Sequence, residues 1–227
     1  MTTVTAGREV ERPLSVRGSL VRLVIGAVVL WAVVAGVGWL LVSSGDGAAV
    51  LRWDQSVERW FAARRTDSWN GLTDYVTAAG GTEVIVGLGI LVALALRLTL
   101  HRWREVLFVL AALAGEVSIF LCATLVIHRH RPDVPHLDTS PPTSSFPSGH
   151  TAAAVTLYVG LAILAWRLSQ HAWVRMLAVV VAVTIPVAVA LSRMYRGMHF
   201  PTDVLTGAMI GLVWLTISAA VVLRGAP

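Results

Sequence analysis

Three short segments contain the residues whose types and spacing could do chemistry. HRHRPD spans residues 128–133, PSGH spans 147–150 and SRMYRGMHFPTD spans 192–203. Each combines arginine or histidine with proline, glycine or acidic residues. Arginine offers a planar pair of donors to phosphate oxygens, and a neutral imidazole can act as a nucleophile. The residue types therefore favour phosphate chemistry at a site assembled from three parts of the chain.

The third segment pairs a histidine with a carboxylate. Pro201 suits the first turn of a helix, so His199 lies just before that helix and Asp203 can lie on the same side four residues later. An aspartate that accepts the N–H of one imidazole nitrogen fixes the tautomer and leaves the other nitrogen free to attack. We therefore predict that His199 is a nucleophile and that Asp203 orients it.

The first two segments supply candidate phosphate ligands. Ser148, Gly149 and His150 stand where a helix is expected to begin, and the unpaired N–H groups of a helix N-terminus attract anions. Taken alone, this pattern is also that of an ordinary helix cap. Arg131 can hold phosphate oxygens with a bidentate fork, whereas Arg129 could equally extend its side chain toward water at a helix end.

A metal site is an alternative interpretation of the first segment. His128, His130, Asp133, His136 and Asp138 fall within eleven residues. Their spacing matches no closed zinc pattern, and the nearby arginines already supply positive charge for phosphate. We therefore expect neither a metal nor a cofactor.

The elements that must position these residues are membrane helices. The chain has 227 residues, of which 56% are hydrophobic and 14% are charged, and its mean hydropathy is +0.73. This composition exceeds what a soluble core needs. Apolar stretches long enough to cross a bilayer begin near residues 21, 83, 106, 148, 174 and 203. The sequence predicts an all-α membrane protein: one domain over residues 1–227, a bundle of six transmembrane helices, and residues 1–20 as a cytoplasmic tail.

The longest stretch outside these helices, residues 44–82, carries a second helical pattern. Trp53, Val57, Trp60 and Phe61 recur on one face, with charged residues between them. This spacing predicts an outer amphipathic helix between transmembrane helices 1 and 2. It could be a lid on the outer ends of the bundle, or it could help to admit lipid.

The charge distribution bears on partners and on sidedness. All 18 basic residues are arginine, so the net charge of +5 does not come from a lysine-rich tail of the kind that binds nucleic acid. A retained first helix with a cytoplasmic N-terminus places ten arginines inside and eight outside, which is a weak positive-inside bias. The three chemical segments then face the extracytoplasmic side of the cytoplasmic (inner) membrane. The single Cys122 lies in an apolar run and excludes an intrachain disulfide.

Together these segments resemble the type 2 phosphatidic acid phosphatases, which share their site with vanadium-dependent haloperoxidases. The motifs of that family are KxxxxxxRP, PSGH and SRxxxxxHxxxD. Residues 147–150 and 192–203 match the second and third motifs completely. Arg131 and Pro132 match the first, but Thr124 stands where that motif has lysine. The resemblance spans residues 124–203 by motif, and the whole chain by its six-helix plan.

The resemblance implies a mechanism that agrees with the residues. It implies that His199 attacks phosphorus to form a phosphohistidine, that Asp203 orients it, and that His150 protonates the leaving alkoxide and later activates water. Phosphate oxygens would be held by ligands that include a neutral hydroxyl at the lysine position and a nearby arginine as a replacement cation. These expected ligands are Arg131, Arg193, Ser148, Gly149, Thr124 and Arg129, with Arg196 as the second choice for the missing cation.

The substrate expected from the resemblance is a lipid with a terminal phosphate in the bilayer. Phosphatidic acid, phosphatidylglycerol phosphate, an undecaprenyl or other polyprenyl diphosphate and a prenyl-linked sugar phosphate all fit, and the oligomeric state does not follow from the sequence. A haloperoxidase-like protein is one alternative. A lipid transporter or scramblase is another, because Glu116 lies within an apolar helix, where a carboxylate is often functional. Alternatively, the Glu116 carboxyl forms a hydrogen bond to a neighbouring helix and has a structural role.

Overall fold

The computed structural model describes residues 16–43, 48–139 and 143–223. Within these ranges every regular element is a helix, which confirms the predicted all-α class. Residues 1–15 of the predicted cytoplasmic tail lie outside the described residues. The helices are α1 (Val16–Ser43), α2 (Ala49–Ala62), α3 (Asp67–Ala78), α4 (Thr82–Leu98), α5 (Trp103–Val126), α6 (Gly149–Leu168), α7 (Ala172–Tyr195), α8 (Pro201–Ser218) and the π-helix η1 (Ala219–Leu223).

Five runs of the described chain are long and apolar enough to cross a membrane: α1, α5, α6, α7 and the continuous run of α8 with η1. Helix α4 alone, with 17 residues, is shorter than these spans. Helices α3 and α4 together have the required length and composition, with a bend of 41° between them. The described chain thus has five candidate spans, or six if the bent pair is one span, so it has the features of a multi-pass membrane protein.

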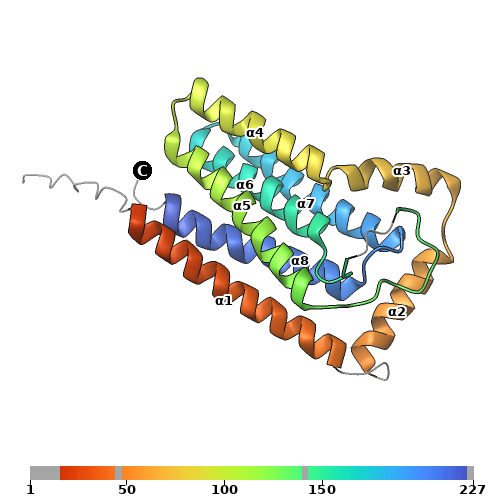
Figure 1. Cartoon of the computed structure of the whole chain (residues 1–227). Helices are drawn as coiled ribbons and strands as arrows, with labels where there is room; N and C mark the ends of the chain where they lie inside the picture. Colours follow the sequence, from red (N-terminus) through yellow and green to blue (C-terminus); the bar gives the residue numbers. More distant parts are fainter. Residues whose placement is uncertain (1–15, 44–47, 140–142, 224–227) are drawn as a thin grey trace, which may run out of the picture.

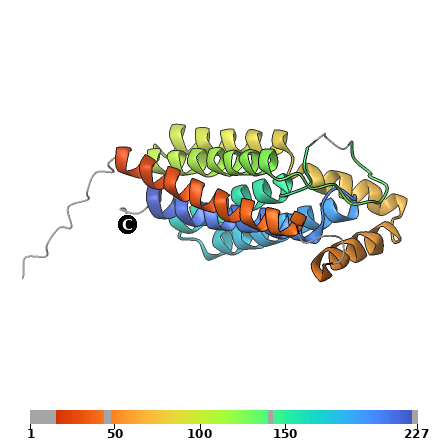
Figure 2. The same ribbon diagram turned by 60° about the horizontal axis from the view of Figure 1, so that its bottom comes forward.

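The long helices lie side by side, and α2 and α3 lie at one end of the bundle (Figures 1 and 2). The connections from α5 to α6 and from α7 to α8 reach the same end, which we call the site end. The beginning of α1 and the end of η1 lie at the opposite end (Figure 1). This arrangement brings the three chemical segments together, because each of them lies where a long helix ends or begins.

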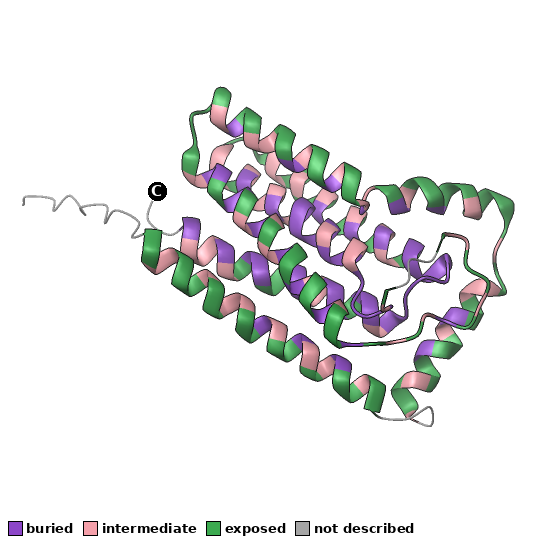
Figure 3. Cartoon of the chain, in the orientation of Figure 1, coloured by how far each residue is buried: buried purple, intermediate pink, exposed green. Residues whose placement is uncertain are grey.

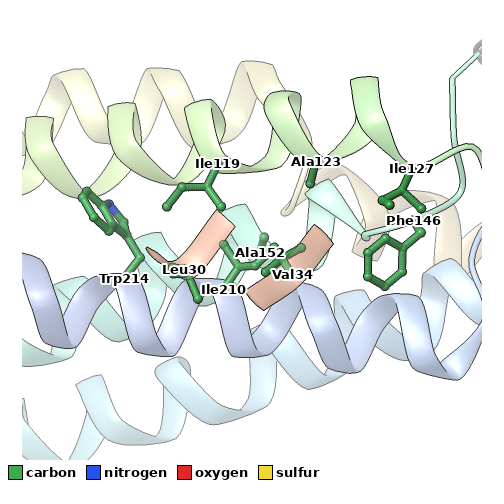
Figure 4. Close-up of a cluster of buried hydrophobic side chains, with 9 residues drawn as sticks. All are labelled: Leu30, Val34, Ile119, Ala123, Ile127, Phe146, Ala152, Ile210 and Trp214. Atoms are coloured by element: carbon green, nitrogen blue, oxygen red, sulfur yellow. The ribbon is translucent and has the colours of Figure 1, made fainter. Parts of the chain in front are cut away.

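Helix α6 occupies the centre of the bundle. It packs against α4, α5, α7 and α8, and half of its most apolar stretch is buried, compared with 11% for α1. Buried positions accordingly concentrate in the inner helices and in the connections at the site end (Figure 3). One buried cluster joins α1, α5, α6 and α8, so that α1 is attached to the bundle along one face (Figure 4). Its members are Leu30, Val34, Ile119, Ala123, Ile127, Phe146, Ala152, Ile210 and Trp214.

The segment between α1 and α4 forms two helices where the sequence predicts one. Thr66 accepts a hydrogen bond from the Trp69 N–H and begins the second of them. In α2 the buried residues are the acidic Asp54 and Glu58, whereas Trp53 and Trp60 are 48% and 51% exposed. The periodicity correctly indicates a helix, but its most deeply buried residues are acidic. The aromatic face packs on the protein only in part, since Val57 and Phe61 are half-buried and Phe61 contacts the Tyr195 ring. Contact of the aromatic face with a bilayer surface stays a prediction.

Helix α5 ends at Val126, and Ile127 is already extended, so the helix stops well before Pro132, which could not continue it. Beyond that point the backbone pairs with the stretch before α6: the Ser145 N–H donates to the Arg129 carbonyl at 2.9 Å. Thr124 and Arg131 therefore do not share a helix face, because tertiary hydrogen bonds have replaced the last helical turns.

Candidate active site

A cavity of about 890 Å³ opens at the site end and continues between α4 and α5. Its polar end is lined by residues of all three chemical segments, and its remaining walls are mainly apolar. The polar lining includes Thr124, Arg131, Asp138, His150, Arg193 and His199; the apolar lining includes Ile85, Val86, Ile90, Leu110, Leu113 and Phe120. The structure thus brings together most of the residues that the sequence analysis singled out.

The turn between α7 and α8 fixes His199. Helix α7 closes with the Met198 N–H donating to the Arg193 carbonyl at 3.0 Å. Gly197 has φ = +75°, a conformation that favours glycine, and a Cβ there would also lie 2.9 Å from Arg65. This sharp turn places His199 directly before α8, at the cavity.

The carbonyl of Ser145 orients the His199 ring. Its oxygen lies 2.6 Å from Nδ1, and because a carbonyl can only accept, Nδ1 carries the hydrogen. Burial, together with the positive charges of Arg193 and Arg131, holds the pKa of His199 well below its ordinary value. The ring is therefore neutral near pH 7, with the lone pair of Nε2 available as a nucleophile.

Asp203 lies farther from His199 than the sequence analysis predicts. Its Oδ2 is 3.9 Å from Nδ1, beyond hydrogen-bonding distance. Instead Oδ2 accepts the Phe200 N–H at 2.9 Å, and Oδ1 accepts from Arg129. The orienting hydrogen bond therefore comes from Ser145, a residue that the sequence analysis missed, since a backbone acceptor leaves no signature in side-chain types.

Arg129 belongs to a buried ion cluster behind His199. Its two terminal nitrogens donate to Asp203 and, at 2.6 Å, to Asp54 of α2. Thr202 adds two hydrogen bonds to Asp54, from its N–H and from its hydroxyl. Arg129 does not line the cavity that holds His199. The prediction that Arg129 replaces the missing lysine as a phosphate ligand is thus corrected, because two carboxylates already neutralise its charge.

Two of the predicted phosphate ligands, Arg131 and Arg193, both line the cavity. Arg131 donates to the Met198 carbonyl at 2.8 Å, and burial lowers its pKa. Arg193 donates to the Thr77 hydroxyl at 2.8 Å and to Asp138 at 2.6 Å. Each guanidinium also keeps a buried Nε without a hydrogen-bond partner among the described residues. Two cationic groups with spare donors therefore converge on the space in front of His199.

Asp138 is an acidic residue of the site whose position the sequence did not reveal. Its carboxylate contacts Arg193 at 2.6 Å and Arg196 at 2.5 Å. Burial alone would raise the pKa of Asp138, but hydrogen bonds and charges from Arg196 and Arg193 outweigh it and hold the pKa below its ordinary value. Arg196 is therefore also paired, which argues against it as the replacement cation. Only its acidic type, noted for the metal alternative, could have drawn attention to Asp138.

The start of α6 contributes Gly149 and His150 to the cavity wall. A Cβ on Gly149 would lie 2.9 Å from the Phe120 ring, so glycine lets the helix start pack closely there. Ser148 is fully buried, its hydroxyl pairs with the Thr151 hydroxyl at 3.0 Å, and it does not line the cavity. The structure thus gives no support to a direct contact between phosphate and the Ser148 side chain.

Two polar groups on the α5 wall lack partners among the described residues. The Thr124 hydroxyl is buried and makes no hydrogen bond, so it can act as a neutral donor at the cavity. Glu116 is 4% exposed and faces the same cavity, and none of its contacts within the described chain is a hydrogen bond or ion pair. The predicted bond from Glu116 to a neighbouring helix is therefore not observed.

Among the described residues, no three His, Cys, Asp or Glu side chains form a group that could hold a metal ion. The five residues of the metal alternative thus do not assemble into such a group. The charged residues of the cavity are instead the two arginines, Asp138 and Glu116. This set can bind an anion next to a neutral histidine.

Comparisons with known proteins agree with this fold. The model of the PAP2 superfamily matches residues 105–225, so the chain belongs to this superfamily. Phosphatidylglycerophosphatase B of Bacillus subtilis is 27% identical over 73% of this chain and 81% of its own length. Undecaprenyl-diphosphatase of Sulfolobus acidocaldarius is 30% identical over 63% of this chain and 65% of its own length.

Solved structures show the same fold. A PAP2 type phosphatidylglycerolphosphate phosphatase from Bacillus subtilis superposes with a TM-score of 0.70 at 22% identity, covering 86% of this chain and 94% of that one. LpxE of Aquifex aeolicus superposes with a TM-score of 0.59 at 23% identity, covering 74% and 95%. At these identities the likeness concerns the arrangement of the helices.

Proposed function

We propose that this chain is an integral membrane lipid phosphatase that removes the terminal phosphate of a phospholipid or a polyprenyl (di)phosphate. The observation that supports this most is the single cavity with His199, His150, Arg131 and Arg193 at one end and apolar side chains of α4 and α5 along the rest. A phosphate group suits the first part and a hydrocarbon chain the second. The curated relatives, named for two lipid phosphates, agree with this proposal.

In the first step, His199 Nε2 attacks phosphorus and the bond from phosphorus to the lipid oxygen breaks. His150 gives its proton to the leaving alkoxide, so that the lipid alcohol departs neutral. The enzyme is left as a phosphohistidine. Ser145 keeps the ring oriented throughout, because its carbonyl accepts the hydrogen of Nδ1.

In the second step, His150 takes a proton from water, the water oxygen attacks phosphorus, and the P–N bond breaks to release inorganic phosphate. Arg131, Arg193 and the Gly149 N–H stabilise the non-bridging oxygens as charge redistributes. For Arg193 this requires the phosphate to share or displace the Asp138 carboxylate. With Thr124 in place of a cation and Asp138 opposite Arg193, we favour a phosphate monoester over a diphosphate.

Release of inorganic phosphate from a panel of lipids tests this function. We expect turnover of at least one of phosphatidic acid, phosphatidylglycerol phosphate and undecaprenyl mono- or diphosphate. We also propose that catalysis needs no metal, so a chelator should change the rate by less than about twofold, whereas vanadate should inhibit because it mimics the pentacoordinate phosphorus. Lipid flux without hydrolysis would favour a transporter, and activity that is lost on chelation and restored by metal would contradict the mechanism.

We further propose that the site faces the extracytoplasmic side of the cytoplasmic membrane. The support is the alternation of spans from a cytoplasmic N-terminus, together with the position of all three segments at the end of the bundle opposite the start of α1 (Figure 1). A lipid phosphate would then be hydrolysed in the outer leaflet. The connections between α4 and α5 and between α6 and α7 would face the cytoplasm.

Thiol labelling in intact cells tests this orientation. In a Cys122→Ala background, a cysteine at the exposed Thr139 is expected to react with a membrane-impermeant reagent. A cysteine at the exposed Gln170, between α6 and α7, is the matched control and should react only after the cells are broken. The reverse pattern would place the chemistry in the cytoplasm.

A further inference from the structure

A second cavity, of about 420 Å³, lies at the site end between the end of α1, helix α2 and the segment 128–134. Arg131 lines both this cavity and the one that holds His199. The segment 128–134 therefore forms a common wall. The polar side chains that line the second cavity are Gln55, Glu58, Arg59, His128, Arg129, His130, Arg131 and Asp133.

Glu58 is the unusual member of this lining. It is 1% exposed, and neither oxygen of its carboxyl group has a hydrogen-bond partner among the described residues. A buried carboxyl without any partner is costly, and such a group in a native protein calls for a bound ligand or water. Burial, with additional repulsion from Asp203 and Asp54, raises the pKa of Glu58 to about 9. The group is therefore protonated near pH 7 and can donate a hydrogen bond.

The other groups of this cavity favour an anion. Arg59 uses its Nε for the Gln55 carbonyl at 3.3 Å, and its two terminal nitrogens make no hydrogen bond within the described chain. The buried Nε of Arg131 also lacks a partner there. Arg129 is neutralised by two carboxylates. The free groups are thus the donors of Arg59, Arg131 and Glu58 together with one anionic acceptor, the exposed carboxylate of Asp133. The two cations outnumber this single carboxylate, which suits a phosphate with its several acceptor oxygens.

We propose that this cavity is a second phosphate-binding site, in which Arg59 and the Glu58 carboxyl donate hydrogen bonds to phosphate oxygens next to Arg131. The proposal rests on the proposed function for its role. The lipid alcohol can return to the bilayer along the apolar walls of α4 and α5, but a phosphate anion cannot, because an unpaired charge there is very costly. Phosphate that the active site releases can bind in the second cavity, which is polar and lies on the other side of the segment 128–134. A lipid headgroup carries the same chemistry.

Binding of inorganic phosphate tests the site directly, without substrate. The probe is radiolabelled phosphate, dialysed to equilibrium against the full chain in phosphatidylcholine nanodiscs. Wild type should bind phosphate in both cavities. In Arg59→Ala the affinity of the second cavity for phosphate should be at least tenfold weaker. Arg64→Ala is the matched control, because Arg64 is exposed on the chain just after α2, stacks on Trp60 and does not line the cavity. Equal binding by the two variants would overturn the proposal.

Glu58 provides a second pair of variants. Glu58→Gln keeps a hydrogen-bond donor of the same shape and should retain phosphate binding within about threefold. Glu58→Leu removes the donor and should weaken the second site about tenfold, as expected for the loss of one hydrogen bond to a charged group. If Gln and Leu at this position bind phosphate equally well, the carboxyl is not part of the site.

Kinetics distinguish the two sources of the phosphate group. Turnover without added phosphate tests the proposed function separately. If the site holds the product, added inorganic phosphate lowers kcat in wild type and Arg64→Ala but not in Arg59→Ala, while its effect on KM, which reports the active site, is the same in all three. If instead phosphatidylglycerol in the nanodisc changes kcat and Arg59→Ala removes that change, the site takes a lipid headgroup. An Arg59→Ala profile identical to wild type in both series would overturn the proposal.

Discussion

Replacement of His199 by alanine is expected to abolish phosphate release, with a fall of more than about 10⁴-fold in kcat, as for the loss of a covalent nucleophile. The reason is geometric, since His199 is a neutral buried imidazole whose Nδ1 is held by Ser145 and whose other nitrogen is left for phosphorus. The measurement is phosphate release from the best lipid of the panel. His171→Ala, an exposed histidine at the opposite end of the bundle, is the matched control and should keep full activity.

Asp203→Asn sharpens this prediction. Because Ser145 and not Asp203 accepts the Nδ1 hydrogen, the asparagine variant should keep more activity than His199→Ala. Any activity that Asp203→Asn loses should come from the weakened ion pair between Asp203 and Arg129. Equal loss in both variants would restore Asp203 as the direct orienting partner, and full activity in His199→Ala would exclude the phosphohistidine mechanism.

Arg129→Ala is expected to destabilise the protein by roughly 3–5 kcal/mol, because it leaves Asp54 and Asp203 as uncompensated buried carboxylates. The measurement is thermal unfolding in detergent, followed by size-exclusion chromatography. Arg64→Ala, which removes an exposed arginine beside α2, should change stability by no more than about 0.5 kcal/mol. Arg129→Lys should recover only part of the loss, since one ammonium cannot reproduce the forked contacts with two carboxylates.

The double variant Asp54→Asn with Arg129→Met separates charge from packing. It removes one carboxylate together with the arginine and should be more stable than Arg129→Ala alone. One result would contradict this structural role of Arg129. If Arg129→Ala keeps its thermal stability but lowers kcat/KM by about 2–4 kcal/mol, Arg129 contacts phosphate as the sequence analysis predicts, and the ion cluster is not its main role.

The sequence by itself determined the class of the fold and the arginines and histidines that line the cavity. Long apolar runs can satisfy their backbone in a bilayer only as helices, so hydropathy predicts the five spans that the described chain contains, and the predicted sixth is present only if α3 and α4 form one bent span. The motif residues Arg131, His150, Arg193 and His199 lie at the ends of these helices, and helix ends on one side of a bundle must meet. The predicted family is confirmed by the match over residues 105–225.

Only the tertiary structure decided which of the remaining charged residues touch one another. Arg129 and Arg131 are two positions apart, yet one closes a buried ion cluster with Asp54 and Asp203 and the other lines the cavity, because their partners lie on different parts of the fold. Asp138 and the Ser145 carbonyl became part of the site through contacts across more than fifty residues. Charge pairing depends on distances of a few ångströms between segments that are remote in sequence, and neither periodicity nor residue type records such distances.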